Sequence, residues 1–358
     1  MSKICVYAIA KNEEQFVDRW VDSMSEADVI VVLDTGSTDR TVAKLKARGV
    51  TVEMETISPW RFDVARNKSM RLIPKDTDIC VCTDLDEVFE PGWADKLREI
   101  WREGARVHYP FVWKVNPDGS DGVVFYGEKI HCFNAYRWVH TVHEVLEWHG
   151  GAVPETHIYT NDIKLRHFPD DTKSRSQYLP LLEIDAQENP LDDRAAHYLG
   201  REYMFCGQYD KAIAELTRHL SLPTATWADE RCASMRFLYA CTGDMNWLYK
   251  AIAEAPNLRE PYYNMAKALL AKDDFHGAIY FAEQGLKITK RTMSYINDKD
   301  ACGSGFHDVL SVAYWWIGDK MRATTHIKEA LKYEPENDRF LSNERLIKGA
   351  RRVELQNR

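Results

Sequence analysis

The sequence lacks any apolar run long enough to cross a bilayer, and its Lys and Arg residues do not outnumber its acidic ones. No membrane-spanning helix is therefore expected. The charged segment 11–14 interrupts the first apolar stretch before a signal-peptide core is complete, so we expect a cytoplasmic protein. The formal net charge of -8 gives no general attraction to nucleic acid or anionic lipid, although an acidic protein can carry a local basic groove.

Two further features are missing, and each excludes a class of protein. The 8 cysteines are scattered, without the paired spacing of a zinc site or a disulfide framework, so we expect reduced residues in the core. No glycine-rich phosphate loop lies near the N-terminus, which argues against a nucleotidyltransferase or another sugar-nucleotide enzyme of that kind.

The length and composition indicate a folded protein of two domains. Hydrophobic residues make up 45% and charged residues 28% of the 358 residues, the balance of a globular protein that is too long for one ordinary core. The pattern changes near residue 172. We therefore expect an α/β domain over residues 1–172 and an all-α domain over residues 173–358.

The first domain alternates apolar β-type runs with amphipathic helical ones, which predicts βαβ units on a mostly parallel sheet. Strands are expected at 3–9, 29–33, 50–56 and 79–82, with helices at 13–23, about 38–48 and 63–72. The segment 106–168 is instead aromatic and punctuated by turns. It predicts antiparallel strands at 107–113, 123–126 and 129–133, with a turn at 117–119.

The second domain repeats a helix, a tight turn and a second helix with small residues at recurring positions. The pairs are expected at 195–203 with 207–213, 237–244 with 247–252, 261–270 with 274–279, and 309–319 with 323–335. They resemble tetratricopeptide repeats, the second pair being degenerate and the last interval being lengthened by an insertion at 291–305. Such pairs must stack to bury their apolar faces, and can serve either a homodimer or acceptor docking.

An acidic tripeptide, Asp84-Leu85-Asp86, directly follows the apolar strand 79–82. Ligands of open α/β sheets bind at the carboxyl ends of strands, and hard divalent cations prefer carboxylate oxygens. Most Asp-x-Asp pairs in an acidic protein are solvated surface residues, so the spacing alone is weak evidence. Its place at a strand end, with Glu87 beside it, favours an Mn²⁺ or Mg²⁺ site.

Four motifs in the first domain lie at strand ends or helix starts: 10–14, 34–39, 62–67 and 83–87. Together they resemble the family 2 inverting glycosyltransferases, which have a GT-A fold (Rossmann-like, with a mixed sheet). The addition of tetratricopeptide-like repeats is similar to a bacterial branch that includes peptide S-glycosyltransferases. The resemblance implies transfer of a hexose from a nucleotide-diphosphate sugar, with UDP-glucose favoured, to a peptide, a saccharide or another acceptor such as a modified nucleic-acid base.

The resemblance also implies roles for individual residues. The residues that match the family's donor-binding positions are Ala8, Ala10, Glu13, Asp34, Asp63, Arg66, Asn67, Asp84 and Leu85. Two basic residues, Lys173 and Arg175, could form a lid over the diphosphate. The metal ligands are expected to be Asp84 and Asp86, completed by His167, because many GT-A enzymes have a late histidine at the metal. For Asp34 the alternative is a plain turn with a helix cap, and for His167 a structural histidine.

Inverting transfer needs a carboxylate that takes the proton of the acceptor. Glu144, in a short His-Glu element similar to one in related bacterial enzymes, is the candidate, and an exposed glutamate on a strand is the alternative. Asp121 and Glu128 are rivals for the role. His140 and His143 would suggest zinc, but no third and fourth ligand occur at recognisable spacing.

A second class of function is an interaction protein, in which the repeats bind a partner and the α/β domain is an inactive relic. Acidic residues at every matched position favour the enzyme instead.

Overall fold

The computed structural model describes residues 1–115, 119–150, 153–170, 178–290 and 292–349. The chain forms two compact units, Met1–Glu188 and Asn189–Arg358. The boundary predicted after residue 172 lies within 171–177, outside the described residues. Helix α5 (Tyr178–Glu188), assigned from the sequence to the helical part, belongs to the first unit. It is attached there by hydrogen bonds such as the one from Thr141 Oγ1 to the carbonyl oxygen of Leu181, at 2.6 Å.

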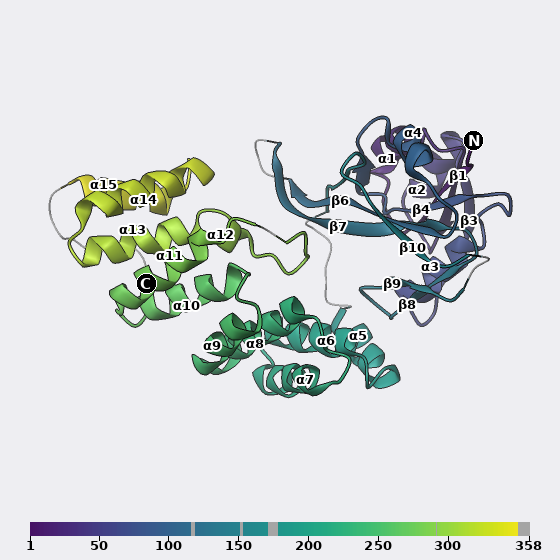
Figure 1. Cartoon of the computed structure of the whole chain (residues 1–358). Helices are drawn as coiled ribbons and strands as arrows, with labels where there is room; N and C mark the ends of the chain where they lie inside the picture. Colours follow the sequence, from purple (N-terminus) through teal and green to yellow (C-terminus); the bar gives the residue numbers. More distant parts are fainter. Residues whose placement is uncertain (116–118, 151–152, 171–177, 291, 350–358) are drawn as a thin grey trace. The chain divides into compact units, whose positions relative to one another are not determined.

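The first four strands of the large sheet in the first unit pair in parallel, as the βαβ pattern predicts (Figure 1). These strands are β1 (Ile4–Ala10), β2 (Val29–Asp34), β3 (Thr51–Met54) and β4 (Ile79–Cys82), in the order β3-β2-β1-β4. The connecting helices are α1 (Val17–Met24), α2 (Thr41–Ala47) and α3 (Phe62–Met70). The carboxyl ends of β1, β2 and β4 consequently lie along one edge.

Beyond β4 the sheet continues through both antiparallel and parallel pairs, which makes it a mixed sheet. Strands β6 (Ala105–Val115), β7 (Asp121–Cys132), β11 (Leu165–His167) and β5 (Glu87–Phe89) continue in the order β4-β7-β6-β11-β5. The pairs β4 with β7, β7 with β6 and β11 with β5 are antiparallel, and β6 with β11 is parallel. Strand β10 (Thr156–Tyr159) also pairs with β6, β8 (Tyr136–Val139) pairs with β9 (Val145–Trp148) in a separate sheet, and α4 (Trp93–Ile100) follows β5.

The elements predicted between residues 117 and 133 are not found as separate, fully described elements. The strands expected at 123–126 and 129–133 are one continuous strand, β7, because pairing with β6 runs through Gly127 with only a local shift of register. The turn expected at 117–119 lies partly outside the described residues.

The central strands are buried on both faces, which explains their continuous apolar runs. Alternate residues of β1 enter two different clusters: Val6 packs with Trp20 and Trp93, and Tyr7 packs with Trp138. Five cysteines are buried as expected, namely Cys5, Cys80, Cys82, Cys132 and Cys232. The expectation was wrong for Cys206, which is exposed where helix α6 ends.

His131 is a buried histidine whose ring is held in one tautomer. The carbonyl oxygen of Cys132 can only accept, so Nδ1 carries the proton, at 2.9 Å, and Nε2 accepts from the Tyr7 hydroxyl at 2.8 Å. Burial lowers the pKa of His131 to about 4, from an ordinary 6.5. The unfolded chain therefore binds one more proton than the folded one between pH 6.5 and pH 4.

We expect the free energy of unfolding to fall as the pH drops through this window, by about 3 kcal/mol at most from His131. Burial also lowers the pKa of His197, to about 3, and of His326, to about 4, so the total effect is larger. Urea unfolding at several pH values measures it. His131→Gln should reduce the slope by about one proton, and an unchanged slope would contradict the assignment.

The second unit consists of paired helices, as predicted (Figure 1). The pairs are α6 (Asp193–Phe205) with α7 (Tyr209–Ser221), α8 (Ala228–Thr242) with α9 (Asn246–Glu254), α10 (Glu260–Leu270) with α11 (Phe275–Lys287), and α13 (Gly305–Trp316) with α14 (Lys320–Tyr333). A short α12 (Lys299–Cys302) lies in the expected insertion, and α15 (Asp338–Lys348) follows the last pair. In the degenerate second pair, α9 is only 9 residues long.

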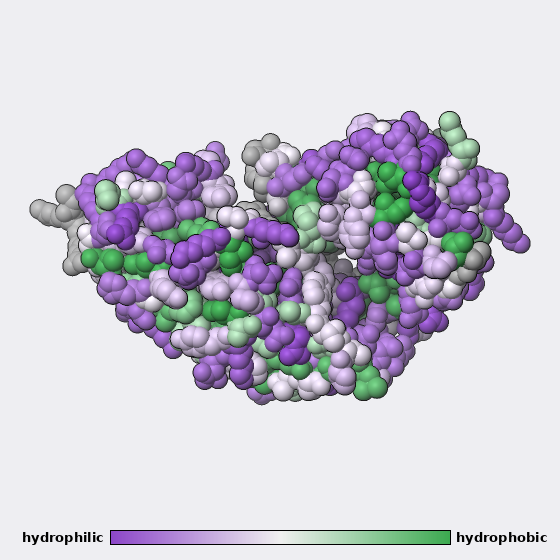
Figure 2. Space-filling model, viewed as in Figure 1, coloured by the Kyte–Doolittle hydropathy of each residue, from purple (hydrophilic) through white to green (hydrophobic). Residues whose placement is uncertain are grey.

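The surface is mainly hydrophilic on the face that Figure 2 shows, with hydrophobic patches over both parts of the chain. Across the described ranges, no helix combines the length and the apolarity needed to cross a membrane.

Candidate functional site

A cluster of charged side chains lies where β4 ends. The loop after Cys82 carries the predicted Asp84 and Asp86 together with Glu87, the first residue of β5. Lys129 comes from the neighbouring β7, since the register pairs Val81 with Ile130 and so brings Lys129 to the end of β4. The predicted acidic motif is thus at the edge where the parallel strands end.

Asp84 is held by two cations. Its Oδ1 accepts from Arg66 Nη2 at 2.8 Å and its Oδ2 from Lys129 Nζ at 3.0 Å. Burial alone would raise the pKa of the Asp84 carboxyl, but the charges of Arg66 and Lys129 hold it well below its usual range. Asp84 is therefore ionised, and its two oxygens face protein cations.

Glu87 completes this ion-pair group. Its Oε1 accepts from Lys129 at 2.8 Å, and its Oε2 accepts from the backbone N–H of Asp84 at 2.9 Å. Burial raises the pKa of Glu87 above its ordinary value, and Asp84 and Asp86 add to the effect although Lys129 opposes it. For Lys129, the two carboxylates outweigh burial and raise its pKa.

Arg66 joins the cluster to the predicted catalytic base. Its Nε donates to Glu144 Oε1 at 2.8 Å while Nη2 binds Asp84, and Nη1 lies 3.4 Å from Cys82 Sγ. The guanidinium group is 5% exposed and lies over the ring of Trp138. Because all three of its nitrogens have protein partners, Arg66 fixes Asp84 and Glu144 in place. The sequence resemblance predicts instead that Arg66 binds the donor.

Asp86 and His167 meet although they are 81 residues apart in the sequence. Strand β11 pairs antiparallel with β5, and this places His167 Nε2 3.2 Å from Asp86 Oδ2. His167 Nδ1 lies 3.2 Å from the carbonyl oxygen of Trp113, which can only accept, so Nδ1 carries a proton. Burial would lower the pKa of His167, but the hydrogen bond and the charge of Asp86 raise it.

The three predicted metal ligands are therefore gathered only in part. Asp86 and His167 point at each other, and the Asp84 carboxylate is turned toward Arg66 and Lys129. Donating one ring N–H to a backbone carbonyl is the usual arrangement of a metal-binding histidine, because it leaves the other nitrogen for the metal. A carboxylate oxygen opposite that nitrogen fits a divalent cation, so the donor set suits the group that the motif predicts.

The predicted nucleoside-binding residues line the ends of β1 and β2. Ala8 and Ala10 are buried, and Ala10 pairs in register with Asp34. Asp34 Oδ1 accepts from the N–H groups of Gly36 and Ser37 at 3.1 and 2.9 Å, which builds the turn proposed as its alternative role. The N–H of Glu13 donates to Thr41 Oγ1 at 2.8 Å, so the two loops are joined.

Of the remaining predicted donor-site residues, Asp63 and Asn67 are hydrogen-bonded to other protein groups and Leu85 is buried. Asp63 accepts two hydrogen bonds from Arg61, at 3.1 and 3.0 Å. Both amide atoms of Asn67 bind the backbone of Trp138, at 2.8 and 2.9 Å, so Asn67 attaches β8 to α3. The side chain of Leu85 is in the core, which leaves only its backbone to meet a ligand. Lys173 and Arg175 lie outside the described residues.

The rivals to Glu144 have other partners. Asp121 forms ion pairs with Lys164 and Arg166, at 2.8 and 2.7 Å, and Glu128 lies 3.5 Å from Arg106. Neither set of ion pairs includes Asp84, Glu87 or Arg66.

The zinc alternative at His140 and His143 gains no support. His140 Nδ1 lies 2.9 Å from Asp185 Oδ2, and among the described residues neither histidine belongs to a group of three or more metal-binding side chains.

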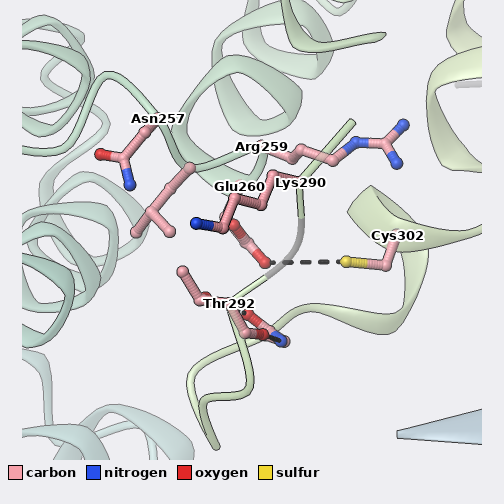
Figure 3. A pocket seen from close by; sticks show the side chains of 8 residues that line it. Asn257, Arg259, Glu260, Lys290, Thr292 and Cys302 are labelled. Atoms are coloured by element: carbon pink, nitrogen blue, oxygen red, sulfur yellow. Dashed lines mark hydrogen bonds between the residues drawn. The ribbon is translucent and has the colours of Figure 1, made fainter. Parts of the chain in front are cut away.

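A small hollow in the second unit is no rival for the donor site. It is lined by residues from the start of α10 and from the segment around α12, and Figure 3 shows the Glu260 carboxyl directed at the Cys302 thiol, 4.0 Å away. Its free volume of 10 Å³ suffices for about one water molecule, far less than a sugar nucleotide needs.

Two members of the cluster were not assigned roles from the sequence. Glu87 was noted only as a neighbour of the acidic pair, and Lys129 was missed altogether. A lysine on a strand carries no local sign of its partner, because the pairing of β4 with β7 joins segments about 50 residues apart in the chain.

Residues 5–143 match the family model described as Glycosyl transferase family 2. The first unit thus contains a glycosyltransferase family 2 domain, built on the mixed α/β sheet and followed by paired helices. The family match ends one residue before Glu144 and does not reach His167.

Solved structures of two kinds show some likeness to this chain. MamA is 19% identical over 44% of this chain and 81% of its own, with a TM-score of 0.34, and YrrB, a TPR protein with an unusual peptide-binding site, is 13% identical over 46% and 81%, with a TM-score of 0.34. Glucosyl-3-phosphoglycerate synthase from Mycobacterium tuberculosis, in complex with Mn²⁺ and UDP-glucose, is 27% identical over 31% of this chain and 44% of its own, with a TM-score of 0.27. No curated protein matches the sequence.

Proposed function

We propose that this protein is a metal-dependent inverting glycosyltransferase that moves a hexose from a nucleotide-diphosphate sugar to a cytoplasmic acceptor. The observation that carries the proposal is the charged cluster at the end of β4, whose acidic residues lie in the segment that matches the glycosyltransferase family 2 model. UDP-glucose is the favoured donor. A peptide, a saccharide and a modified nucleic-acid base remain the acceptor classes.

Asp86 and His167 are the residues that would hold Mn²⁺ or Mg²⁺, since their ligand atoms already face each other at 3.2 Å. The ion, when bound, neutralises charge on the departing diphosphate. Arg66 and Lys129 would hold the Asp84 carboxylate in place beside this pair of ligands. The small Ala8 and Ala10 would let base and ribose lie close to the backbone, and the buried Asp34 would hold the shape of the neighbouring turn.

Glu144 is the proposed general base. In the transfer, the acceptor oxygen forms a bond to the anomeric carbon while the bond from that carbon to the diphosphate breaks, and a carboxylate takes the acceptor's proton. Glu144 is 11% exposed and its Oε1 is bound to Arg66. Arg66 therefore sets the position of this carboxylate relative to Asp84.

The proposal is tested by incubating the purified chain with Mn²⁺ or Mg²⁺ and a panel of UDP-sugars. We expect slow, metal-dependent hydrolysis of one donor, with UDP-glucose first, because water can replace a missing acceptor. No hydrolysis of any donor, together with no donor binding by calorimetry, would favour the interaction protein with a relic domain. Mass spectrometry of host lysate treated with enzyme and donor would then identify the acceptor.

Replacing Glu144 by glutamine should abolish transfer and leave donor binding intact. The amide keeps the size of the side chain and can still accept from Arg66, but it cannot take a proton, and general bases contribute about 10²–10⁴-fold to rates. Donor affinity by calorimetry and turnover by UDP release separate the two effects. Glu128→Gln is the matched control and should stay active; an active Glu144→Gln would disprove the assignment.

The helical unit is proposed to dock the acceptor or to join two copies of the chain. Stacked helix pairs present extended surfaces that serve either purpose.

A further inference from the structure

The second unit contains a buried group of two histidines and one glutamate contributed by three successive helices. His197 lies in α6, His219 in α7 and Glu230 in α8. Their exposed fractions are 1%, 0% and 3%, and one ligand atom from each can be chosen so that all three lie within 4.8 Å of one another. All three residues belong to the second unit, and the proposed transfer assigns them no role.

His219 is the unusual member. Its side chain is completely buried, yet neither Nδ1 nor Nε2 has a hydrogen-bond partner among the described residues. Nε2 lies 3.3 Å from Glu230 Oε1, but not in hydrogen-bonding geometry. Leaving a buried polar group unsatisfied costs about 1–3 kcal/mol, so native proteins normally supply such a group with a partner, a water molecule or an ion.

We propose that His197, His219 and Glu230 bind a divalent transition-metal ion of the zinc class. Two imidazoles and one carboxylate are a recognised zinc donor set, which leaves the fourth position for water. Ligand bonds of 2.0–2.1 Å in a tetrahedral site place neighbouring ligand atoms about 3.3 Å apart, and the observed separation of His219 Nε2 from Glu230 Oε1 is 3.3 Å.

Neighbouring side chains already orient two of the ligands. The Ser234 hydroxyl binds His197 Nδ1 at 2.7 Å, which leaves Nε2 of that ring for a metal ion. The Tyr295 hydroxyl donates to Glu230 Oε2, so the carboxylate offers Oε1 to the site. Outer contacts of this kind are usual around metal ligands, because they fix ring and carboxylate orientation.

Positive charge beside the site sets a limit on its affinity. The ring centroids of Tyr198 and the proposed ligand His197 are 5.7 Å apart. The guanidinium groups of Arg194 and Arg201 lie over the Tyr198 ring, at 4.8 and 4.4 Å from its centroid. They oppose a bound cation, so the ion should bind more weakly than at an isolated His₂Glu site. The ion would connect α6, α7 and α8 and thereby stabilise the first helix pair against the second.

The test uses the full chain carrying Asp86→Asn, so that metal at the first unit does not contribute. The chelator-treated protein is given Zn²⁺ and passed over a desalting column, and its metal content is measured by mass spectrometry. We expect about one equivalent of Zn²⁺, a rise in Tm on adding Zn²⁺, and, with Co²⁺ in its place, the visible absorption of a four-coordinate ion.

Two variants and a control decide the outcome. His219→Gln and Glu230→Gln should each lose the zinc equivalent and the Zn²⁺-dependent rise in Tm, while His276→Gln, at an exposed histidine of α11, should keep both. Glu230→Gln retains the contact with Tyr295, so it is expected to fold even if His219→Gln does not, and circular dichroism in chelator checks this. No bound Zn²⁺ in the parent, or equal binding by folded variants, would overturn the proposal. Donor turnover is not measured, so this result is independent of the proposed transferase activity.

Discussion

Asp86→Asn is expected to reduce metal-dependent donor turnover by about 100-fold or more, with the fold unchanged. The substitution removes the negative charge opposite His167 Nε2, where the divalent ion is proposed to bind. Losing one group that stabilises developing charge typically costs 10²–10³-fold in rate. Mn²⁺ binding, followed by electron paramagnetic resonance of the free ion, should weaken in parallel with turnover.

The control is Asp95→Asn, which removes an aspartate of α4 that is 86% exposed. It should bind Mn²⁺ and turn over donor like the wild type. If Asp86→Asn bound Mn²⁺ with unchanged affinity, the metal would have to lie elsewhere, and the pairing of Asp86 with His167 would be a structural contact only.

Arg66→Met is expected to lower the free energy of unfolding substantially. Methionine fills similar space but leaves Glu144, which is 11% exposed, without its cationic partner, and it removes one of the two cations on Asp84. Breaking a buried ion pair costs about 3–5 kcal/mol. Because Asp84 is 35% exposed and keeps Lys129, we expect about 3 kcal/mol, the lower end of that range. Urea unfolding measures the loss.

Two comparisons separate charge from packing. Adding Glu144→Gln to Arg66→Met should recover part of the lost stability, because the unpaired charge is then gone. Arg40→Met breaks an exposed pair with Glu14 and should unfold close to the wild-type midpoint. Equal midpoints for Arg66→Met and wild type would show that the buried bridge is not formed in solution.

The strands β1 to β4 could be predicted from the sequence because they are short apolar runs that end in polar turns. Asp34 and Asp84 each follow such a run, and the structure places both at the same edge. The helix pairs could be predicted equally well, since the turn within each of the four pairs contains glycine or aspartate. Asp274 and Asp319, for example, cap α11 and α14 by accepting from the N–H three residues on.

The rest of the site depends on contacts between distant segments, which local patterns do not encode. Lys129 reaches Asp84 only because β7 lies antiparallel to β4, and Arg66 meets Glu144 only because β8 is attached to α3 through Asn67. The sequence around His219 did not indicate a metal site, because the other two residues of the group, His197 and Glu230, come from the helices before and after its own. Periodicity predicts that a helix has a buried face, but not which buried polar groups will meet there.

The place of β5 has a practical consequence for anyone who shortens this chain. Strand β5 begins at Glu87, directly after the acidic tripeptide, and within the described residues it is attached to the sheet through β11 (Leu165–His167). A fragment cut at residue 143, where the family match ends, would retain all four motifs and still lose β11, and with it the strand that holds β5 in place. The segment that matches the family model, residues 5–143, is thus shorter than the folding unit, Met1–Glu188. A fragment made for expression should therefore extend at least through α5.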